Sequence, residues 1–340
     1  MPIEIIKKYP EMIRNSIDLV NRAKLPNYEF DEILVCGIGG SGIGGCLLKD
    51  LLSGKVDCPV DVYSGYELPY YADDRTLVFC VSYSGNTEET LSQFSEAVKR
   101  GCKIIAFSSN GKLEEWCKKL SVPFVKLPQG FLPREALPYL FIPMVAYLQK
   151  IKFVNYEKEL KDAVKVLTEL NFQHYFKLVD DLRDSFPVIY ASNKFAAVAK
   201  RIQNQFNENS KIPAKHEILP ELNHNEVNAY QDEKLNDNLS LLLLRDEADL
   251  EQVKTRFTLT GDIARSKVKA VNEIYAKGSS LLSKMFFLIA VGDYLSYKVA
   301  EAKNVDPSQV KFNDIIKEKL KKHRTVEKLE EELPSRSPDG

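Results

Sequence analysis

Short apolar runs alternate with longer helical stretches from Glu32 onward, and this alternation constrains the fold more than any other feature of the chain. The runs EILVCG, TLVFCVS and KIIAFSS carry apolar side chains at consecutive positions, as strands buried on both faces do. The stretches between them, such as TEETLSQFSEAVKR, have the length and spacing of surface helices. The pattern predicts an α/β fold, in which a doubly wound parallel sheet is covered by helices on both sides.

The second half of the chain follows the same plan without repeating the sequence of the first. The runs PVIYAS, LSLLLL and VKAVNEIYA predict strands, and a long helix is expected from about Ser279 to Ala302. Another helix is predicted by an apolar stripe that consists of Phe195, Val198, Ile202 and Phe206. Because 340 residues exceed what a single core usually serves, we expect two doubly wound parallel-sheet domains, covering residues 1–151 and 152–340.

Charge and composition exclude several classes of function. Lysine and arginine number 47 and aspartate and glutamate 48, so a net charge of -1 offers no attraction for nucleic acid or an anionic membrane. The start of the chain, MPIEIIKKYPEM, lacks the continuous apolar core of a signal peptide, and we expect a cytoplasmic protein. The six cysteines form no CxxC pair and are interpreted as packing residues rather than disulfide or metal-binding residues.

The glycine-rich segment GIGGSGIGG, residues 37–45, directly follows the first predicted strand. Its Gly37, Gly39 and Gly42 satisfy the pattern of dinucleotide-binding folds, and Asp61 falls near the end of the next strand, where an acid that binds ribose is expected. The same glycines also suit the phosphate of a small substrate, or merely the close packing of a helix. This segment alone does not distinguish the three interpretations.

The segment SYSGNTEET, residues 82–90, follows the next long apolar run and favours a phosphate. Ser82, Ser84 and Thr87 offer hydroxyl donors just before a predicted helix, whereas a helix cap alone would need only Thr87. The start of a helix adds unpaired N–H groups and the positive end of the helix dipole, worth roughly 0.3–1 kcal/mol at an exposed site. Because loops that follow neighbouring parallel strands meet at one edge of the sheet, the two segments together predict a phosphosugar site.

Six segments occur in an order that resembles the archaeal-type bifunctional phosphoglucose/phosphomannose isomerases, which consist of tandem sugar isomerase (SIS) domains. The segments are GIGGSGIGG, SYSGNTEET, GFLPREALPYLF, NENSK, PELNHNE and VDP. The resemblance extends from about residue 30 to about residue 320. It implies interconversion of glucose 6-phosphate or mannose 6-phosphate with fructose 6-phosphate, without a metal or another cofactor. Use of both epimers is implied by the resemblance alone, and an enzyme that accepts only one of them remains open.

The resemblance also implies which residues bind the substrate. The matching positions for the sugar and its phosphate are Gly40, Ser41, Ser82, Ser84 and Thr87. Arg134, in the PRE of GFLPREAL, matches an arginine of the family that contacts the substrate and contributes to catalysis.

Three further residues are implied to be catalytic. Glu208 of NENSK corresponds to the base, and His224 of NHNE corresponds to the histidine that opens the sugar ring. Lys317 corresponds to a catalytic lysine, although the run IIKEKLKKH offers several lysines, within a tail predicted to be one helix from Lys317 to Leu333. In this family the histidine enters the site from the partner subunit, so a homodimer in which His224 is donated across the interface is implied.

The chemistry of isomerisation requires these residue types. A proton must move between two adjacent carbons, which calls for one base that reaches both, and a carboxylate such as Glu208 suits this task. Opening a cyclic hemiacetal needs an acid–base group of the histidine type, for which His216 is an alternative to His224. Arg134 can stabilise the negative charge of the enediolate that forms. The four histidines show no HxH or HxxxH pattern, so no metal site is predicted.

Two other functions account for part of the same features. A phosphosugar-binding regulator would keep both loops and lack catalysis. A nicotinamide-dependent dehydrogenase would explain the glycine-rich segment but not the hydroxyl groups of residues 82–90.

Overall fold

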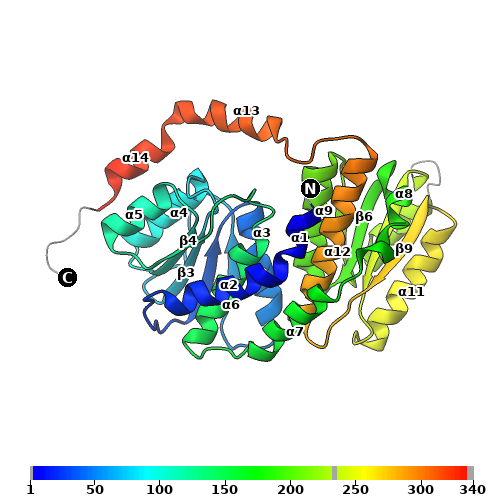
Figure 1. The fold of residues 1–340 in the computed structure, drawn as a ribbon, viewed down its shortest axis with the longest axis horizontal. Helices are drawn as coiled ribbons and strands as arrows, with labels where there is room; N and C mark the ends of the chain where they lie inside the picture. The colour runs from blue at the N-terminus through cyan, green and yellow to red at the C-terminus, as the bar shows by residue number, and fades with distance from the viewer. Residues whose placement is uncertain (1–2, 232–235, 335–340) are drawn as a thin grey trace. The chain divides into compact units, whose positions relative to one another are not determined.

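The computed structural model describes residues 3–231 and 236–334 and contains two compact units (Figure 1). The β1–β5 unit consists of Glu11–Tyr156 and Val310–Gly340, and the β6–β9 unit consists of Met1–Pro10 and Glu157–Gln309. In this division each chain end belongs to the unit that is formed mainly by the other half of the chain. The division falls at three places: within helix α2 (Tyr9–Arg22), directly before helix α7 (Glu157–Thr168), and between Gln309 and Val310.

The β1–β5 unit contains a parallel sheet whose strand order is β2-β1-β3-β4-β5. Its strands are β1 (Glu32–Cys36), β2 (Val60–Tyr63), β3 (Thr76–Val81), β4 (Lys103–Ser108) and β5 (Phe124–Lys126). Its helices include α3 (Gly40–Leu52), α4 (Glu88–Lys99), α5 (Lys112–Leu120) and α6 (Leu137–Lys150). Every residue of β3 is buried, as the continuous apolar run predicts for a central strand.

Helices cover both faces of this sheet. On one face, apolar residues of β1, β3 and β4 form a core with Phe94 of α4 and Trp116 of α5. On the other face, Phe79 of β3 packs edge-on against Tyr147 of α6, and Gly45 of α3 allows that helix to approach Val35. This doubly wound arrangement is the one predicted from the sequence.

The β6–β9 unit contains a second parallel sheet whose order is β7-β6-β8-β9. Its strands are β6 (Phe186–Ser192), β7 (Lys215–Leu219), β8 (Leu239–Arg245) and β9 (Ala270–Tyr275). Its helices and turns are α1 (Ile3–Lys7), α7 (Glu157–Thr168), η1 (Phe172–Tyr175), α8 (Leu178–Arg183), η2 (Asn193–Phe195), α9 (Ala196–Gln205), η3 (Phe206–Ser210), η4 (Glu221–His224), η5 (Glu226–Gln231), α11 (Glu251–Arg265) and α12 (Leu281–Ala302). The long helix predicted from about Ser279 is α12, whose first turn is fixed by a capping box at Ser280.

The C-terminal segment differs from the single helix expected between Lys317 and Leu333. It forms α13 (Lys311–Leu320), a short turn η6 (Lys321–His323) and α14 (Thr325–Glu332). The chain turns at Arg324, whose φ of 53° is left-handed. This turn allows α14 to pack on α4, with Leu333 buried in the apolar core there and Glu332 paired with Lys99 at 2.7 Å. Packing of the second part of the segment thus interrupts a helix that its composition favours.

Candidate active site

The two segments predicted to bind phosphate meet at the carboxyl edge of the first sheet. We call residues 37–45 the glycine loop and residues 82–90 the serine loop. They follow β1 and β3, which are adjacent strands at the point where the strand order reverses. Ser41 Oγ accepts a hydrogen bond of 3.2 Å from the Tyr83 N–H, and a Cβ at Gly37 would lie 2.9 Å from the Val81 carbonyl oxygen. The two loops are therefore in direct contact.

Helix α4 begins in the serine loop without a side-chain cap. Thr87 is the N-cap residue, but its hydroxyl makes no capping bond and lies 3.0 Å from Ser82 Oγ instead. Ser82 Oγ also accepts a 3.1 Å hydrogen bond from the Gly85 N–H. The interpretation of Thr87 as a cap alone is therefore wrong. Its hydroxyl and that of Ser82 stand together beside the N–H groups of a helix start, as an anion site requires.

The glycine loop supplies a second helix start at the same edge. Helix α3 begins at Gly40, and its N-cap residue Gly39 has no side chain with which to cap it. A Cβ at Gly40 would lie 2.8 Å from the Pro133 carbonyl oxygen and 3.3 Å from the Arg134 nitrogen. Only a glycine therefore allows the segment that carries Arg134 to lie against this loop, and Arg134 itself is buried.

Ser84 projects from a turn that depends on its neighbouring glycine. Ser84 is exposed, and its hydroxyl accepts a 3.3 Å hydrogen bond from the Asn86 N–H. Gly85 has a φ of 69°, and a Cβ there would lie 1.7 Å from the Asn110 carbonyl oxygen. The turn thus requires glycine for both its backbone angle and its packing, and it presents Ser84 to solvent.

Tyr83 is a residue of this site that the sequence analysis did not single out. Its hydroxyl donates to the Pro128 carbonyl oxygen at 2.8 Å and accepts from the Phe131 N–H at 3.1 Å. Its own N–H is bonded to Ser41. Tyr83 therefore connects both loops with the segment that leads to Arg134. The only sequence signal was its place between two predicted site serines.

Asp61 does not occupy the position of an acid that binds ribose. It is the second residue of β2, opposite Leu34 within the sheet, rather than a residue beyond the strand's carboxyl end. Lys49 Nζ lies 2.9 Å and the Tyr71 hydroxyl 2.8 Å from its carboxylate, and both hydrogen bonds lower the pKa of Asp61. The dinucleotide interpretation therefore lacks the acidic residue that would bind the ribose.

Glu208 belongs to the β6–β9 unit and lies on the π-helical turn η3 that continues helix α9. The residue is partly exposed, while Phe206, Asn209 and Ser210 of the same turn are buried. The predicted apolar stripe from Phe195 to Phe206 is fully buried, and α9 packs against strands β6 and β7 and helix α12. Glu208 thus extends from a firmly packed helix and remains accessible.

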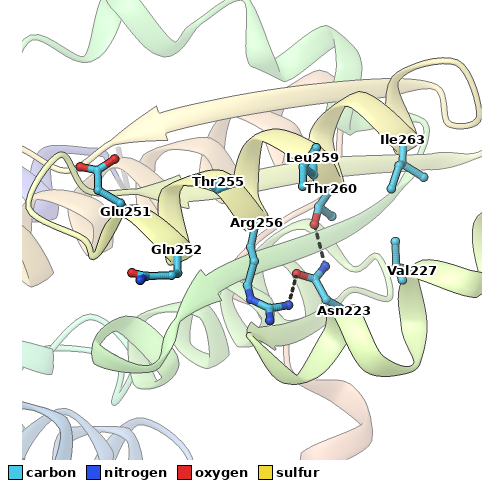
Figure 2. Close-up of a pocket in the computed structure, with 9 residues that line it drawn as sticks. All are labelled: Asn223, Val227, Glu251, Gln252, Thr255, Arg256, Leu259, Thr260 and Ile263. Atoms are coloured by element: carbon cyan, nitrogen blue, oxygen red, sulfur yellow. Dashed lines mark hydrogen bonds between the residues drawn. The ribbon is translucent and has the colours of Figure 1, made fainter.

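His224 is the last residue of the turn η4 and is exposed. Its neighbour Asn223 is held by helix α11: its Nδ2 donates to Thr260 Oγ1 at 2.8 Å, and its Oδ1 accepts from Arg256 Nη1 at 3.2 Å. Figure 2 shows these two bonds. They fix the backbone that carries His224 while leaving the imidazole free of packing contacts that would bury it.

A groove of about 580 Å³ lies beside this turn (Figure 2). It is lined by Asn223, Val227, Glu251, Gln252, Thr255, Arg256, Leu259, Thr260 and Ile263. None of the predicted site residues lines the groove. It adjoins the turn that ends at His224 and is mainly a feature of the outer surface of α11.

His216, the alternative acid–base group, lies on strand β7. Its Nδ1 is hydrogen-bonded to Gln203 Oε1 of α9, and burial lowers the pKa of His216. Strand β7 itself was not predicted, because it is an edge strand whose sequence KHEIL has only one fully buried side chain. A histidine tied to a neighbouring helix in this way fits a structural role.

Lys317 lies in the middle of α13, in the β1–β5 unit, and is exposed. No side chain of this helix is buried. The predicted substrate-binding residues lie in one region of the β1–β5 unit: Gly40, Ser41, Ser82, Ser84, Thr87 and Arg134. Glu208 and His224 lie in the β6–β9 unit. Lys317 lies on a solvent-exposed helix.

Other kinds of site are not found in the described residues. Within residues 3–231 and 236–334, no group of three or more histidine, cysteine or acidic side chains is arranged to hold a metal ion. All six cysteines are free thiols, and three of them are buried. Over the same ranges, none of the helices combines the length and the apolarity that crossing a membrane requires.

Comparison with known proteins identifies relatives over nearly the whole chain. Residues 176–320 match the family described as bacterial phospho-glucose isomerase C-terminal SIS domain. A bifunctional phosphoglucose/phosphomannose isomerase of Caldicellulosiruptor bescii is 35% identical over 332 residues, which cover 93% of this chain and 98% of the relative. A D-glucosamine-6-phosphate 4-epimerase of Sulfolobus acidocaldarius is 30% identical, over 85% of this chain and 89% of the relative.

Solved structures show the same fold. The C-terminal domain of glucosamine-fructose-6-phosphate aminotransferase from Francisella tularensis superposes with a TM-score of 0.70. The match covers 90% of this chain and 96% of that domain, with 15% sequence identity. The two-sheet α/β architecture is thus shared with a protein of very different sequence.

Proposed function

The chain belongs to the family of bifunctional phosphoglucose/phosphomannose isomerases, and we propose that it interconverts glucose 6-phosphate and mannose 6-phosphate with fructose 6-phosphate. The observation that carries this proposal is the contact between the glycine and serine loops. Their hydroxyl groups and two helix starts without side-chain caps lie together at the point where strand order reverses. A sugar phosphate uses both loops, whereas a dinucleotide uses only the first.

The proposed binding mode follows from the chemistry of the two loops. Ser82, Ser84 and Thr87 donate hydrogen bonds to the phosphate, together with the N–H groups at the start of α4. Gly40 and Ser41 lie against the sugar, which the lack of a side chain at Gly40 permits. The phosphate then serves as a fixed anchor, and its binding energy is available to orient the carbons that react.

The proposed reaction has two acid–base stages. His224 transfers the proton that opens the cyclic hemiacetal, and Glu208 then removes a proton from C2 and returns it to C1. The electron pair of the broken C–H bond forms the C1=C2 bond, and the carbonyl pair moves to O1, giving an enediolate whose charge Arg134 stabilises without changing its own protonation. A proton passes from O2 to O1, and the carbonyl forms at C2 when C1 takes up its proton. The reaction has no net oxidation or reduction, and the proposed residues supply the acid, the base and the positive charge that it requires, so the proposal includes no metal or other cofactor.

A homodimer is part of the proposal. We propose that His224 acts in the site of the partner subunit, and its exposure on η4 supports this role. Lys317 is proposed as a further catalytic group, and exposure of the whole of α13 is consistent with a helix that contacts another surface in the assembled enzyme. The free thiols are compatible with a reducing, cytoplasmic location.

The decisive experiment compares turnover of glucose 6-phosphate and mannose 6-phosphate, side by side and in the presence of EDTA. We expect both to yield fructose 6-phosphate, and Glu208→Gln to abolish turnover while sugar-phosphate binding persists. A Glu208→Gln variant that works near the wild-type rate would show that the base is another residue. Loss of activity in EDTA with recovery on adding zinc would overturn the metal-free chemistry.

The same assay separates the other two functions. A phosphosugar-binding regulator would bind glucose 6-phosphate without forming product. A dehydrogenase would change the fluorescence of added NADH on binding it, and we expect no such change.

Mixing two inactive variants tests the donation of His224. In a hybrid dimer of Glu208→Gln and His224→Asn subunits, one of the two sites keeps both residues if His224 crosses the interface. About a quarter of wild-type activity is then expected after random exchange of subunits, because half of the dimers are hybrids with one intact site. If His224 acts within its own chain, mixing restores nothing.

A further inference from the structure

The turn that carries Glu208 is fastened to helix α12 by the two residues that follow Glu208. Asn209 Nδ2 donates to Ser296 Oγ at 2.9 Å, and Ser210 Oγ donates to the Ser296 carbonyl oxygen at 2.6 Å. Ser296 Oγ in turn donates to the Asp293 carbonyl oxygen at 2.7 Å. Asn209, Ser210 and Ser296 are all fully buried. One residue of α12 thus holds two consecutive residues of the turn.

The helix that precedes Glu208 is fixed to the same segment of α12. Arg201 of α9 donates to the two carboxylate oxygens of Asp293, from Nε at 3.2 Å and from Nη2 at 2.9 Å. The Tyr9 hydroxyl also donates to Asp293, at 2.6 Å. Burial by itself lowers the pKa of Arg201, but the charge of Asp293, together with Tyr9 and Glu208, raises it above its usual value. Arg201 is therefore a permanent cation in the fully buried pair.

The conformation of η3 explains why such anchoring is needed. A π-helical turn is less favourable than an α-helical one and persists where the surrounding structure stabilises it. Asn207 Oδ1 accepts from the Ala214 N–H at 3.0 Å, so the residue before Glu208 is fixed as well. The backbone on both sides of Glu208 is thus held, while its carboxylate remains partly exposed.

We propose that Ser296, whose hydroxyl accepts the bond from Asn209, is a positioning residue that sets the orientation of the Glu208 carboxylate. This inference rests on the proposed function, in which Glu208 is the base. A displacement of about 1 Å at a reacting group can reduce the rate about 100-fold. In the proposed binding mode the phosphate is held by the glycine and serine loops and not by η3, so loss of the anchor is expected to reduce kcat and to leave KM nearly unchanged.

Ser240 provides a matched control for Ser296. It is equally buried, and its hydroxyl donates to the Asp181 carbonyl oxygen at 2.7 Å at the start of β8, the opposite end of the strand from the sheet's carboxyl edge. Ser296→Ala and Ser240→Ala each delete one buried hydroxyl. In Ser296→Ala the bond from Asn209 is lost, while the bond from Ser210 to the backbone carbonyl of residue 296 remains. We expect kcat to fall about 10–100-fold in Ser296→Ala, with KM for glucose 6-phosphate within about threefold of wild type, and no change of kcat in Ser240→Ala.

An isotope effect distinguishes positioning from a general loss of structure. With substrate deuterated at C2, the effect on kcat should increase in Ser296→Ala, because proton abstraction becomes the slow step, and should stay at the wild-type value in Ser240→Ala. If Ser296→Ala does not accumulate as folded protein, Asn209→Ala deletes the same bond by removing its donor. This variant should likewise show a lower kcat with a nearly unchanged KM.

Two outcomes would overturn different parts of this inference. A kcat for Ser296→Ala and Asn209→Ala within about twofold of Ser240→Ala would show that the anchor does not position Glu208. An active Glu208→Gln variant would instead show that Glu208 is not the base, and a wild-type protein without turnover would refute the proposed function. Either result would remove the positioning role as well.

Discussion

In both sheets the first strand lies between the second and the third, so the strand order reverses between β1 and β3 and again between β6 and β8. At the first junction the loops present glycines, the hydroxyls of Ser82 and Thr87, and two helix starts without side-chain caps. At the second junction the equivalent loops present Lys194 after β6 and Asp246 after β8. The two positions have the same topology and very different contents.

The second junction is occupied by the protein's own charges. Lys194 Nζ lies 2.6 Å from Asp246 and 2.9 Å from Asp249, and Lys284 Nζ lies 2.7 Å from Asp246. Ser192, the last residue of β6, donates to Asp249 at 3.3 Å. Two lysines thus face two aspartates, and the cluster is neutral without any ligand.

The difference shows that topology provides the same place in both units and that loop residues decide whether it is filled by charges of the chain itself. Parallel strands direct their carboxyl ends to one edge in both units, and helices start there in both. At the first junction, within the described part of the chain, the Ser82 and Thr87 hydroxyls are bonded to each other and to the Gly85 N–H rather than to a carboxylate. At the second, carboxylates from the same chain already occupy the lysine donors.

The largest expected effect concerns Arg134 at the first junction. Arg134→Met should lower kcat/KM for glucose 6-phosphate about 10²–10³-fold, because the enediolate of the proposed reaction would lose its fixed positive charge. Arg134→Lys should recover part of the rate, since it keeps the charge without the planar guanidinium. Thermal unfolding of both variants controls for the loss of a buried side chain. Wild-type kinetics in Arg134→Met would remove the residue from the site.

At the second junction the expected effect is on stability alone. Asp246→Asn leaves two lysines without their shared carboxylate and should lower the free energy of unfolding by about 3 kcal/mol. This value is at the low end for a broken buried ion pair, because Lys194 is partly exposed. Urea unfolding at neutral pH measures this loss. A change in KM of more than about twofold would contradict the view that this junction binds no substrate.

The free energy of unfolding of Asp246→Asn, measured as a function of pH, provides a further test of the ion cluster. Burial opposes ionisation of Asp246, but hydrogen bonds from Lys194 and Lys284 outweigh it and lower its pKa. A lowered carboxyl pKa stabilises the folded state above the unfolded value of about 3.9 and ceases to do so as pH falls through the folded value. The stability difference between wild type and Asp246→Asn should therefore shrink in acid, below about pH 4.

Removal of the paired hydroxyls at the first junction should have an intermediate effect. The double variant Ser82→Ala, Thr87→Val is expected to weaken inhibition by inorganic phosphate about 10–100-fold, because two donors to the anion are lost. Ser192→Ala, which removes a hydroxyl at the second junction, is the matched control and should leave this inhibition constant unchanged. Equal effects of the two changes would contradict the contrast between the junctions.

The smallest expected effect is at Asp61. Asp61→Asn breaks a solvent-exposed ion pair with Lys49 and should change the free energy of unfolding by less than about 1 kcal/mol. Its kcat/KM should equal that of wild type, because the carboxylate lies within β2 and away from the strand end. A large loss of substrate affinity in this variant would revive a role for Asp61 in binding.

The sequence predicted the parts of this structure that depend on local patterns. Continuous apolar runs identified buried strands such as β3 and β8, and the stripe from Phe195 to Phe206 identified helix α9. It failed where packing overrides the pattern. Strand β7 lies at a sheet edge and is only partly buried, and the C-terminal helix is divided at Arg324 so that α14 can pack on α4.

The candidate site was predictable to a similar extent. Ser82 and Thr87 stand out because hydroxyls cluster after a strand, and glycines mark a close approach of backbone. No local pattern predicts that Tyr83 joins the two loops or that Ser296 holds the turn that carries Glu208. Both residues form hydrogen bonds with residues that are distant in the sequence.

The sequence by itself determined that the chain forms α/β layers, which apolar runs form strands buried on both faces, and where the backbone approaches closely, because apolar periodicity and glycine content act within a few residues. Only the tertiary structure decided that one reversal of strand order keeps donors available for an anion while the other is filled by Lys194, Lys284, Asp246 and Asp249. These charges come from separate elements, and their neutralisation depends on distances of a few ångströms that folding alone sets.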